Sequence, residues 1–206
     1  MTDAFALLNE PRRPWFDAEE LKARFLPLSA GTHPDKTHGA SADEKRAASS
    51  KYAELNAAFN TLKEPRDRLR HLYELEAGEK PKDIQRIPPG TMDLFVEVGQ
   101  TCRDADAFLQ KKSGHDSPML KLQWMQDGFD WLDRLQSLQG RVNTMRDQLS
   151  AELREMNGIW DAAPPSGSPG RRAALPLERL EQIYRSMSYI ARWTEQIQER
   201  LVQLSL

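Results

Sequence analysis

The residues best placed to recognise another molecule form one short run, His33-Pro34-Asp35-Lys36. Proline fixes its own φ angle, so its neighbours project from a turn with little conformational entropy left to lose on binding. The carboxylate of Asp35 is able to accept charge-assisted hydrogen bonds from an arginine of a partner, and the imidazole of His33 offers a further hydrogen bond. The run therefore indicates a rigid polar tip suited to protein recognition.

Enzymatic and metal-binding alternatives find little support in the sequence. His33, Asp35 and His38 are conceivable metal ligands, but they lie in an expected loop and no fourth ligand is evident. A Ser/His/Asp hydrolase needs a nucleophile on a sharp turn after a strand, and no strand is predicted. The single Cys102 has no partner for a disulfide or a CxxC metal site, so it is expected to be a small buried apolar residue. We expect no catalysis, no bound metal and no cofactor.

An amphipathic helix is predicted before the run. Asp17 can cap its first N–H groups, and Glu20, three residues later, can complete a capping box. Pro27 and Gly31 disturb the pattern, because a proline removes a backbone donor and clashes with the preceding turn. The helix is therefore expected to be kinked or to end early. Its apolar stripe consists of Leu21, Phe25 and Leu28.

A second, longer helix is predicted after the run. Ser41 and Glu44 form another capping box, and the Ala-rich stretch that follows carries an apolar stripe as far as Pro65. Pro65 is suited to begin a third helix, which Gly78 ends. Two amphipathic helices joined by a short polar loop pair into an antiparallel hairpin. Such a hairpin would hold residues 33–36 at its tip.

Three further helical patterns follow in the C-terminal half, and they predict a three-helix antiparallel bundle. Apolar residues recur there at spacings of three and four, most regularly in the last helix, after Pro176. Gly128 and Gly140 weaken the middle helix and are expected to mark kinks or a break. The Pro- and Gly-rich composition of residues 161–175 predicts a flexible loop.

The sequence therefore predicts an all-α fold in two parts. A small helical module is expected over residues 1–78, and the helical bundle over residues 91–206. Residues 79–90, rich in Pro and Gly, are interpreted as the linker between them.

Composition excludes several classes of partner. Lys and Arg number 29 against 31 Asp and Glu, which gives a net charge of −2 and no general attraction to nucleic acid or to an anionic membrane. No apolar run approaches the ~20 residues that a membrane-spanning helix needs. The first residues resemble neither a signal peptide nor a transit peptide. A cytoplasmic protein without nucleic-acid or membrane partners is expected.

Placed between these helices, the run resembles the HPD motif of a J-domain, the module of the DnaJ superfamily. The chain is most similar to the HscB branch, the co-chaperones of iron–sulfur cluster assembly. The stretches that carry this resemblance are 21-LKARF-25, 55-LNAAFNTLKEP-65, 68-RLRHLYELEAG-78 and 184-YRSMSYIARWTEQIQERL-201. The resemblance implies that residues 1–78 are a J-domain.

The resemblance also implies a chaperone partner. In this family the HPD loop and the helix before it dock on an ATP-bound chaperone of the DnaK/HscA type and promote ATP hydrolysis. The basic residues Lys22, Arg24 and Lys36 would then contribute to the chaperone-binding face with His33, Pro34 and Asp35. The residues just before the motif, 29–32, lack the basic and aromatic side chains that the family pattern has there.

A second partner is implied for the bundle. HscB proteins hold an iron–sulfur scaffold protein of the IscU type through an apolar face of the first bundle helix. Leu94, Phe95 and Val98 lie in the corresponding helix and are the candidates for this contact. Two other interpretations stay open: a J-domain co-chaperone for another client, and a helical adaptor that has lost ATPase stimulation.

Overall fold

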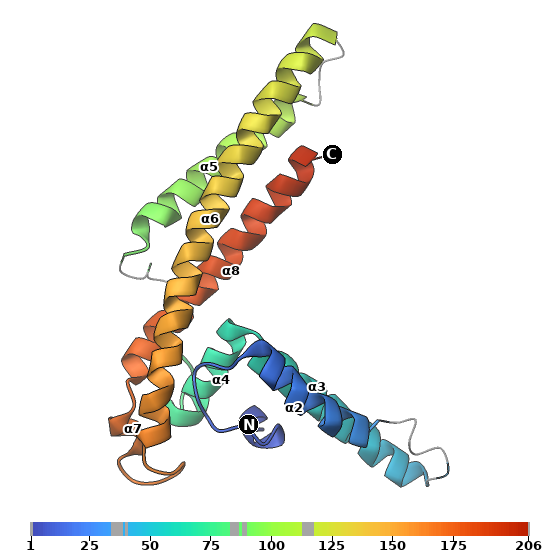
Figure 1. The fold of residues 1–206 in the computed structure, drawn as a ribbon, viewed down its shortest axis with the longest axis vertical. Coiled ribbons are helices and arrows are strands. Elements are labelled where there is room, and N and C mark those ends of the chain that lie inside the picture. The colour runs from blue at the N-terminus through green and yellow to red at the C-terminus, as the bar shows by residue number, and fades with distance from the viewer. Residues whose placement is uncertain are drawn as a thin grey trace. The chain divides into compact units, whose positions relative to one another are not determined.

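The computed structural model describes residues 2–33, 39, 41–82, 87, 90–112 and 118–205. All regular secondary structure in these ranges is helical, which confirms the prediction of an all-α fold (Figure 1). The helices are α1 (Ala4–Leu7), α2 (Ala18–Gly31), α3 (Ala42–Lys63), α4 (Pro65–Ala77), α5 (Met92–Lys112), α6 (Pro118–Ala162), α7 (Arg171–Ala174) and α8 (Leu177–Ser205).

The chain divides into two compact units. Unit 1 combines Met1–Lys82 with Ser150–Tyr184, and unit 2 combines Asp83–Leu149 with Arg185–Leu206. The long helices α6 and α8 therefore contribute one end to each unit. The J-domain expected over residues 1–78 lies within unit 1, which also contains the C-terminal end of α6, all of α7 and the start of α8.

Helices α2 and α3 form the expected hairpin in unit 1. The Asp17 side chain accepts hydrogen bonds from the N–H groups of Glu19 and Glu20, so α2 begins where the cap was predicted. The predicted capping box at the start of α3 is confirmed, because Ser41 and Glu44 bond each other reciprocally. The two helices are joined by the stacked rings of Phe25 and Phe59, whose centroids lie 4.3 Å apart. Buried leucines extend this contact along both helices: Leu21, Leu55 and Leu62.

Helix α2 does not end early at Pro27 but continues to Gly31. Pro27 lies on the exposed side of α2, where water can replace the missing backbone donor. The opposite side, with Leu21 and Phe25, is buried. Burial of that apolar side therefore outweighs the missing backbone bond, and the helix reaches the residue before Thr32.

Helix α4 carries the buried centre of unit 1. The guanidinium of Arg68 donates to the carbonyls of Pro14, at 2.9 Å, and Leu62, at 2.6 Å. Burial lowers the pKa of Arg68 to about 10. On the same helix, the ring of His71 stacks on Phe5 of α1 with 5.8 Å between centroids. Arg68 and His71 therefore hold the N-terminal segment against α4 at two separate points.

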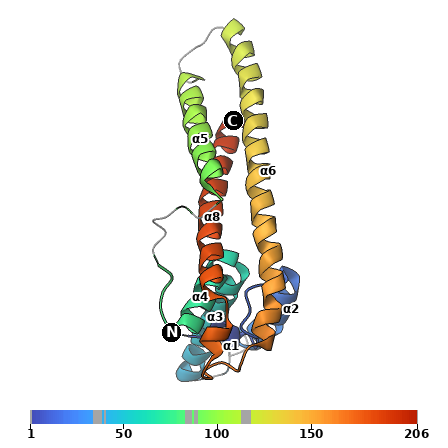
Figure 2. The same ribbon diagram turned by 90° about the vertical axis from the view of Figure 1, so that its left-hand side faces the viewer.

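Unit 2 is built from α5, the first part of α6 and the last part of α8 (Figure 2). Phe108 of α5 contacts Trp124 and Trp131 of α6, and Gln139 of α6 donates to Thr194 of α8 at 3.4 Å. Glu97, earlier in α5, pairs instead with Arg141, later in α6, which confirms the predicted antiparallel arrangement of these two helices. The core of this unit is formed by Val98, Cys102, Ala105, Leu135, Leu138, Val142, Met187, Ile190, Trp193, Ile197 and Leu204.

Two details of the C-terminal half differ from the sequence-based expectations. Helix α6 runs for 45 residues without a break at Gly128 or Gly140, since neither glycine has a positive φ angle and the stripe on both sides of Gly140 is buried. The range 161–175 contains the end of α6 and the short helix α7, with the side chain of Arg171 buried.

Candidate functional site

The imidazole of His33 lies at the loop end of the α2–α3 hairpin, two residues after α2 ends. Its ring meets Tyr52 of α3 edge to face, with 5.1 Å between centroids. This contact sets the position of the first residue of the motif relative to both helices. Pro34, Asp35 and Lys36, together with His38, lie outside the described residues.

The two predicted basic residues of α2 have different surroundings. The Lys22 side chain is 56% exposed and has only a long contact to Glu19, 3.9 Å between Nζ and Oε2. Arg24 donates to Glu10 at 3.1 Å, and the Glu10 side chain is only 1% exposed. Burial raises the pKa of Glu10, although Arg24 and Arg13 oppose the shift. Lys22 is therefore an available surface cation, whereas Arg24 already compensates a buried carboxyl group.

A shallow groove of about 310 Å³ lies beside Lys22 on the α2–α3 hairpin. The stacked rings of Phe25 and Phe59 line it, and Leu26 beside them is 54% exposed. Lys63 of α3 lines the groove with Lys22. Sequence analysis missed Leu26 and Lys63. Leu26 could have been found from the sequence, because an apolar residue directly after Phe25 lies off the buried stripe and must be exposed or bound.

The predicted client-binding residues of α5 do not share one environment. Phe95 is 39% exposed and Leu94 is half-buried, whereas Val98 has no exposed surface and packs in the core of unit 2. Val98 was a candidate because it lies in the helix that the resemblance implies, but its i+4 spacing from Leu94 continues along the buried side of that helix. The exposed apolar residues beside Phe95 are Met92, at 54%, and Val96, at 57%.

Phe95 and Val96 border a second groove, of about 370 Å³, between α5 and α8 in unit 2. Tyr189 meets Phe95 edge to face with 6.0 Å between centroids, and Trp193 lies 5.8 Å from Tyr189. Sequence analysis assigned none of the α8 residues to a binding surface. The pair 189 and 193 was detectable as two aromatic residues one helical turn apart, beside the regular apolar stripe.

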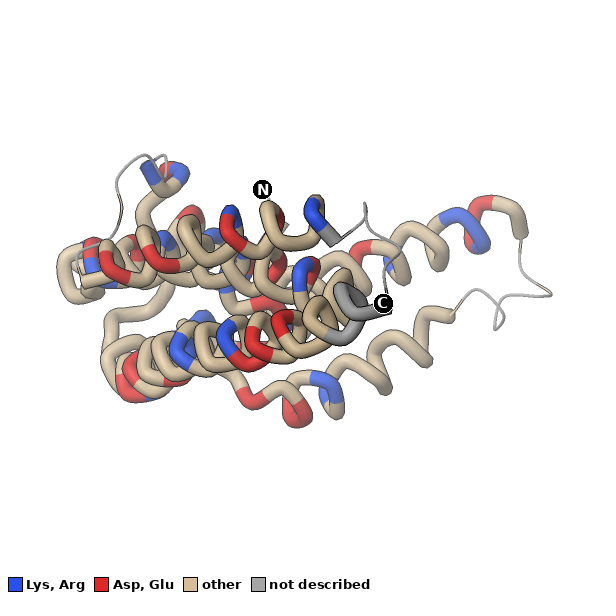
Figure 3. Tube along the Cα trace, turned by 90° about the horizontal axis from the view of Figure 1, so that it is seen from above, with Lys and Arg blue, Asp and Glu red and all other residues tan. Residues whose placement is uncertain are grey.

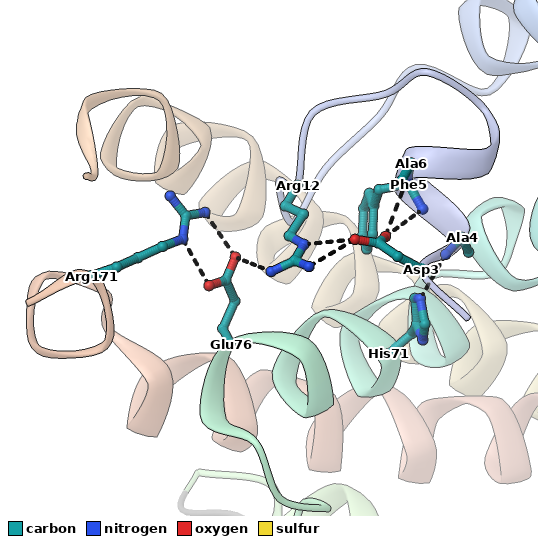
Figure 4. A network of polar contacts seen from close by, with 8 residues as sticks. All are labelled: Asp3, Ala4, Phe5, Ala6, Arg12, His71, Glu76 and Arg171. Carbon is teal, nitrogen blue, oxygen red and sulfur yellow. Dashed lines mark hydrogen bonds and ion pairs between the residues drawn. The ribbon is translucent and has the colours of Figure 1, made fainter. Parts of the chain in front are cut away.

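A network of polar contacts in unit 1 joins the N-terminal segment to α4 and α7 (Figure 4). Arg12 donates to Asp3 from Nε and Nη2, at 3.0 and 2.7 Å, and its Nη1 lies 3.9 Å from the carboxylate of Glu76. Arg171 of α7 pairs with the same carboxylate at 2.7 Å. Burial alone would raise the pKa of Asp3, but bonds from Arg12 and from the backbone of α1 lower it overall. The network ties the N-terminal segment and α4 to α7.

The residues that the structure describes offer few groups for metal binding or for reactive side-chain chemistry. No group of three or more His, Cys, Asp or Glu residues there is arranged to hold a metal ion. Cys102 is buried, and burial raises the pKa of its thiol, opposed mainly by Arg200. Acidic and basic residues are interspersed along the helices (Figure 3). Among the described helices none has the length and hydropathy to cross a membrane.

Comparisons with known proteins give consistent results, although no family model matches the chain. A co-chaperone protein HscB homolog of Chromobacterium violaceum is 31% identical over 152 residues, which are 73% of this chain and 76% of that protein. A second HscB homolog, from Mannheimia succiniciproducens, is 33% identical over 100 residues, 48% of this chain and 56% of that protein.

Solved structures show the same fold at lower identity. The chaperone HscB from Vibrio cholerae superposes with a TM-score of 0.65 at 18% identity, covering 98% of this chain and 99% of that one. The human co-chaperone protein HscB gives a TM-score of 0.59 at 17% identity, covering 97% and 82%.

Proposed function

This chain belongs to the HscB family of co-chaperones, and on that premise we propose that it stimulates ATP hydrolysis by a DnaK/HscA-type chaperone through His33, Pro34 and Asp35. The observation that carries the proposal is the position of His33 at the loop end of a hairpin whose helices are capped and joined by stacked aromatic rings. A rigid hairpin presents the motif with little ordering cost on docking.

The proposed docking face continues from His33 along α2. Lys22 supplies an available cation, and the groove between Phe25 and Phe59 supplies apolar surface beside it. Arg24 contributes less than the sequence suggested, since it is held by Glu10. The proposal also includes Lys36 as a chaperone-binding residue and a J-domain that ends at residue 78. The proposed location of the protein is the cytoplasm.

Single-turnover ATP hydrolysis by the chaperone encoded in the same genome tests the first proposal. The wild-type protein is expected to accelerate hydrolysis, and Asp35→Asn and His33→Gln are expected to abolish the acceleration. Circular dichroism and thermal unfolding check that both variants remain folded. A matched control is Asp104→Asn on α5 in unit 2, an aspartate outside unit 1, which is expected to leave stimulation unchanged. Absence of stimulation by the wild-type protein would favour the adaptor instead.

We also propose that the bundle presents an IscU-type iron–sulfur scaffold protein to the chaperone. Phe95 and Leu94 are retained as contact residues, and Val96 replaces the buried Val98. The exposed apolar side of α5, which includes Met92, supports this assignment, because apolar side chains gathered on a surface commonly mark a protein interface.

Titration calorimetry with the purified scaffold protein tests the client assignment. Phe95→Ala together with Val96→Ser is expected to weaken binding at least about tenfold, since buried aromatic side chains dominate interface energetics. The control pair is Met125→Ala with Phe129→Ala, two exposed apolar residues of α6 that do not line the groove. Binding of an unrelated client and not of the scaffold would leave a J-domain co-chaperone with another substrate.

A further inference from the structure

We propose that the groove between α5 and α8 in unit 2 binds an apolar side chain of the client that has a carboxylate next to it. The inference rests on the proposed client-binding function and specifies the chemistry of the client segment. Its basis is the shape of the groove floor and the charge of its rim.

The floor of the groove is made by Gly99, at the middle of α5. Glycine has no side chain, so it leaves room where a longer residue would project into the groove. A Cβ atom at Gly99 would meet only the end of the Arg103 side chain, at 3.4 Å. The missing side chain leaves open space in the groove that Phe95 and Trp193 also line.

The walls of this space are apolar and partly aromatic. Phe95 and Val96 line it from α5, and Tyr189 and Trp193 from α8. The edge-to-face contact between Phe95 and Tyr189 holds the two walls in a fixed relation. A groove of about 370 Å³ with such walls has the size and polarity to receive one or two apolar side chains.

The rim carries two arginines, Arg103 on α5 and Arg192 on α8. Among the described residues neither is paired with a carboxylate. Arg103 donates to the neutral Gln100 at 2.7 Å, which holds its guanidinium near the groove. Arg192 is exposed and makes no ion pair with the residues that the structure describes.

This arrangement contrasts with the other arginine between the two helices. Arg200 of α8 donates to Asp106 of α5 at 2.7 Å, so its charge is compensated within the protein. Arg103 and Arg192 therefore bring two positive charges without carboxylate partners to the rim of an apolar groove. A client segment with a carboxylate beside its apolar side chain would complement both properties, and a basic segment would be repelled.

Binding of the IscU-type scaffold protein, measured by calorimetry over a series of salt concentrations, tests the inference. Gly99→Leu fills the space at this position, where its Cβ atom would meet only the end of the flexible Arg103 side chain, and is expected to weaken binding about tenfold or more. Arg103→Glu with Arg192→Glu is expected to weaken it by a similar factor at low salt and to flatten its salt dependence. The matched controls in unit 2 are Gly140→Leu, which has open space around it, and Arg146→Glu on α6.

The outcomes separate the two levels of the proposal. If the wild-type protein does not bind the scaffold, the client assignment fails and takes the groove chemistry with it. If the wild-type protein binds but the arginine reversals leave affinity and salt dependence unchanged, only the carboxylate assignment fails. If Gly99→Leu binds as tightly as the Gly140→Leu control, the groove is not the binding site, even when Phe95 and Val96 prove to be contacts.

Discussion

The carboxylate of Glu76 accepts hydrogen bonds from Nε and Nη2 of Arg171, at 2.8 and 2.7 Å, although the residues are 95 positions apart. Their side chains are 3% and 9% exposed. The hydrogen bonds that Arg171 donates to Glu76 raise the pKa of Arg171, although burial opposes the shift. This bidentate contact joins the last turn of α4 to α7 within unit 1.

Breaking this pair from either side is expected to destabilise unit 1 strongly. Glu76→Leu or Arg171→Met leaves one buried charge without its partner, which costs about 3–5 kcal/mol in the free energy of unfolding. Chemical denaturation followed by circular dichroism measures the change. The double variant, which removes both charges, is expected to recover part of the loss. Single variants within about 0.5 kcal/mol of wild type would mean that solvent compensates the remaining charge.

A stability dependence on pH is expected from His71. Its Nε2 atom accepts a hydrogen bond from the backbone N–H of Ala4 at 3.0 Å, which only the neutral imidazole can do. Burial lowers the pKa of His71 below its usual 6.5; Asp3 and Glu74 oppose this shift, while Arg12 and Arg70 favour it. The unfolded chain therefore binds the proton more readily, so this contribution is present above pH 6.5 and is lost as the pH falls.

Unfolding experiments between pH 7.5 and about 5 test this dependence, because a group with an ordinary pKa near 6.5 titrates in that window. His71→Leu is expected to be less stable at pH 7.5 and to show a smaller decline towards pH 5. His33→Gln is the matched control, since it removes an imidazole from unit 1 but keeps the bond to Ala4. An equal decline in His71→Leu and wild type would assign the pH dependence to other groups.

Local signals predicted the α2–α3 hairpin well. The caps at Asp17 and Ser41 and the apolar stripe through Leu21 and Phe25 are interactions between neighbours in the sequence, which a pattern can report. The continuation of α2 through Pro27 was not predicted, because it depends on which side of the helix is buried.

The environment of single site residues was harder to predict. Arg24 looked like a free surface cation, but its partner Glu10 is 14 positions away and buried. The spacing of Leu94 and Val98 was correct for one helix face, yet it did not reveal that this face points into the core. Such features depend on contacts between distant segments, and a single sequence carries little direct signal for them.

Arg68 is expected to be difficult to replace. Its guanidinium satisfies the carbonyls of Pro14 and Leu62 in a buried setting, and each hydrogen bond to a charged group contributes about 1.5–3 kcal/mol. Arg68→Met is therefore expected to lower the free energy of unfolding by about 3 kcal/mol or more. Arg68→Lys should be similarly harmful, because one ammonium group cannot reproduce the two directions of the guanidinium. A lysine variant as stable as wild type would contradict this geometric argument.

Replacing Gly140 or Gly78 with alanine is expected to change the free energy of unfolding in opposite directions. Gly140 lies inside α6 with ordinary helical φ and open space at its Cβ position, so Gly140→Ala should raise the free energy of unfolding by up to about 1 kcal/mol. Gly78 ends α4 with φ of +73°, where an L side chain clashes with its own backbone. Gly78→Ala is therefore expected to cost about 1–2 kcal/mol, measured by the same denaturant titration. Stabilisation by both substitutions would show that the C-terminal end of α4 adopts another backbone conformation in solution.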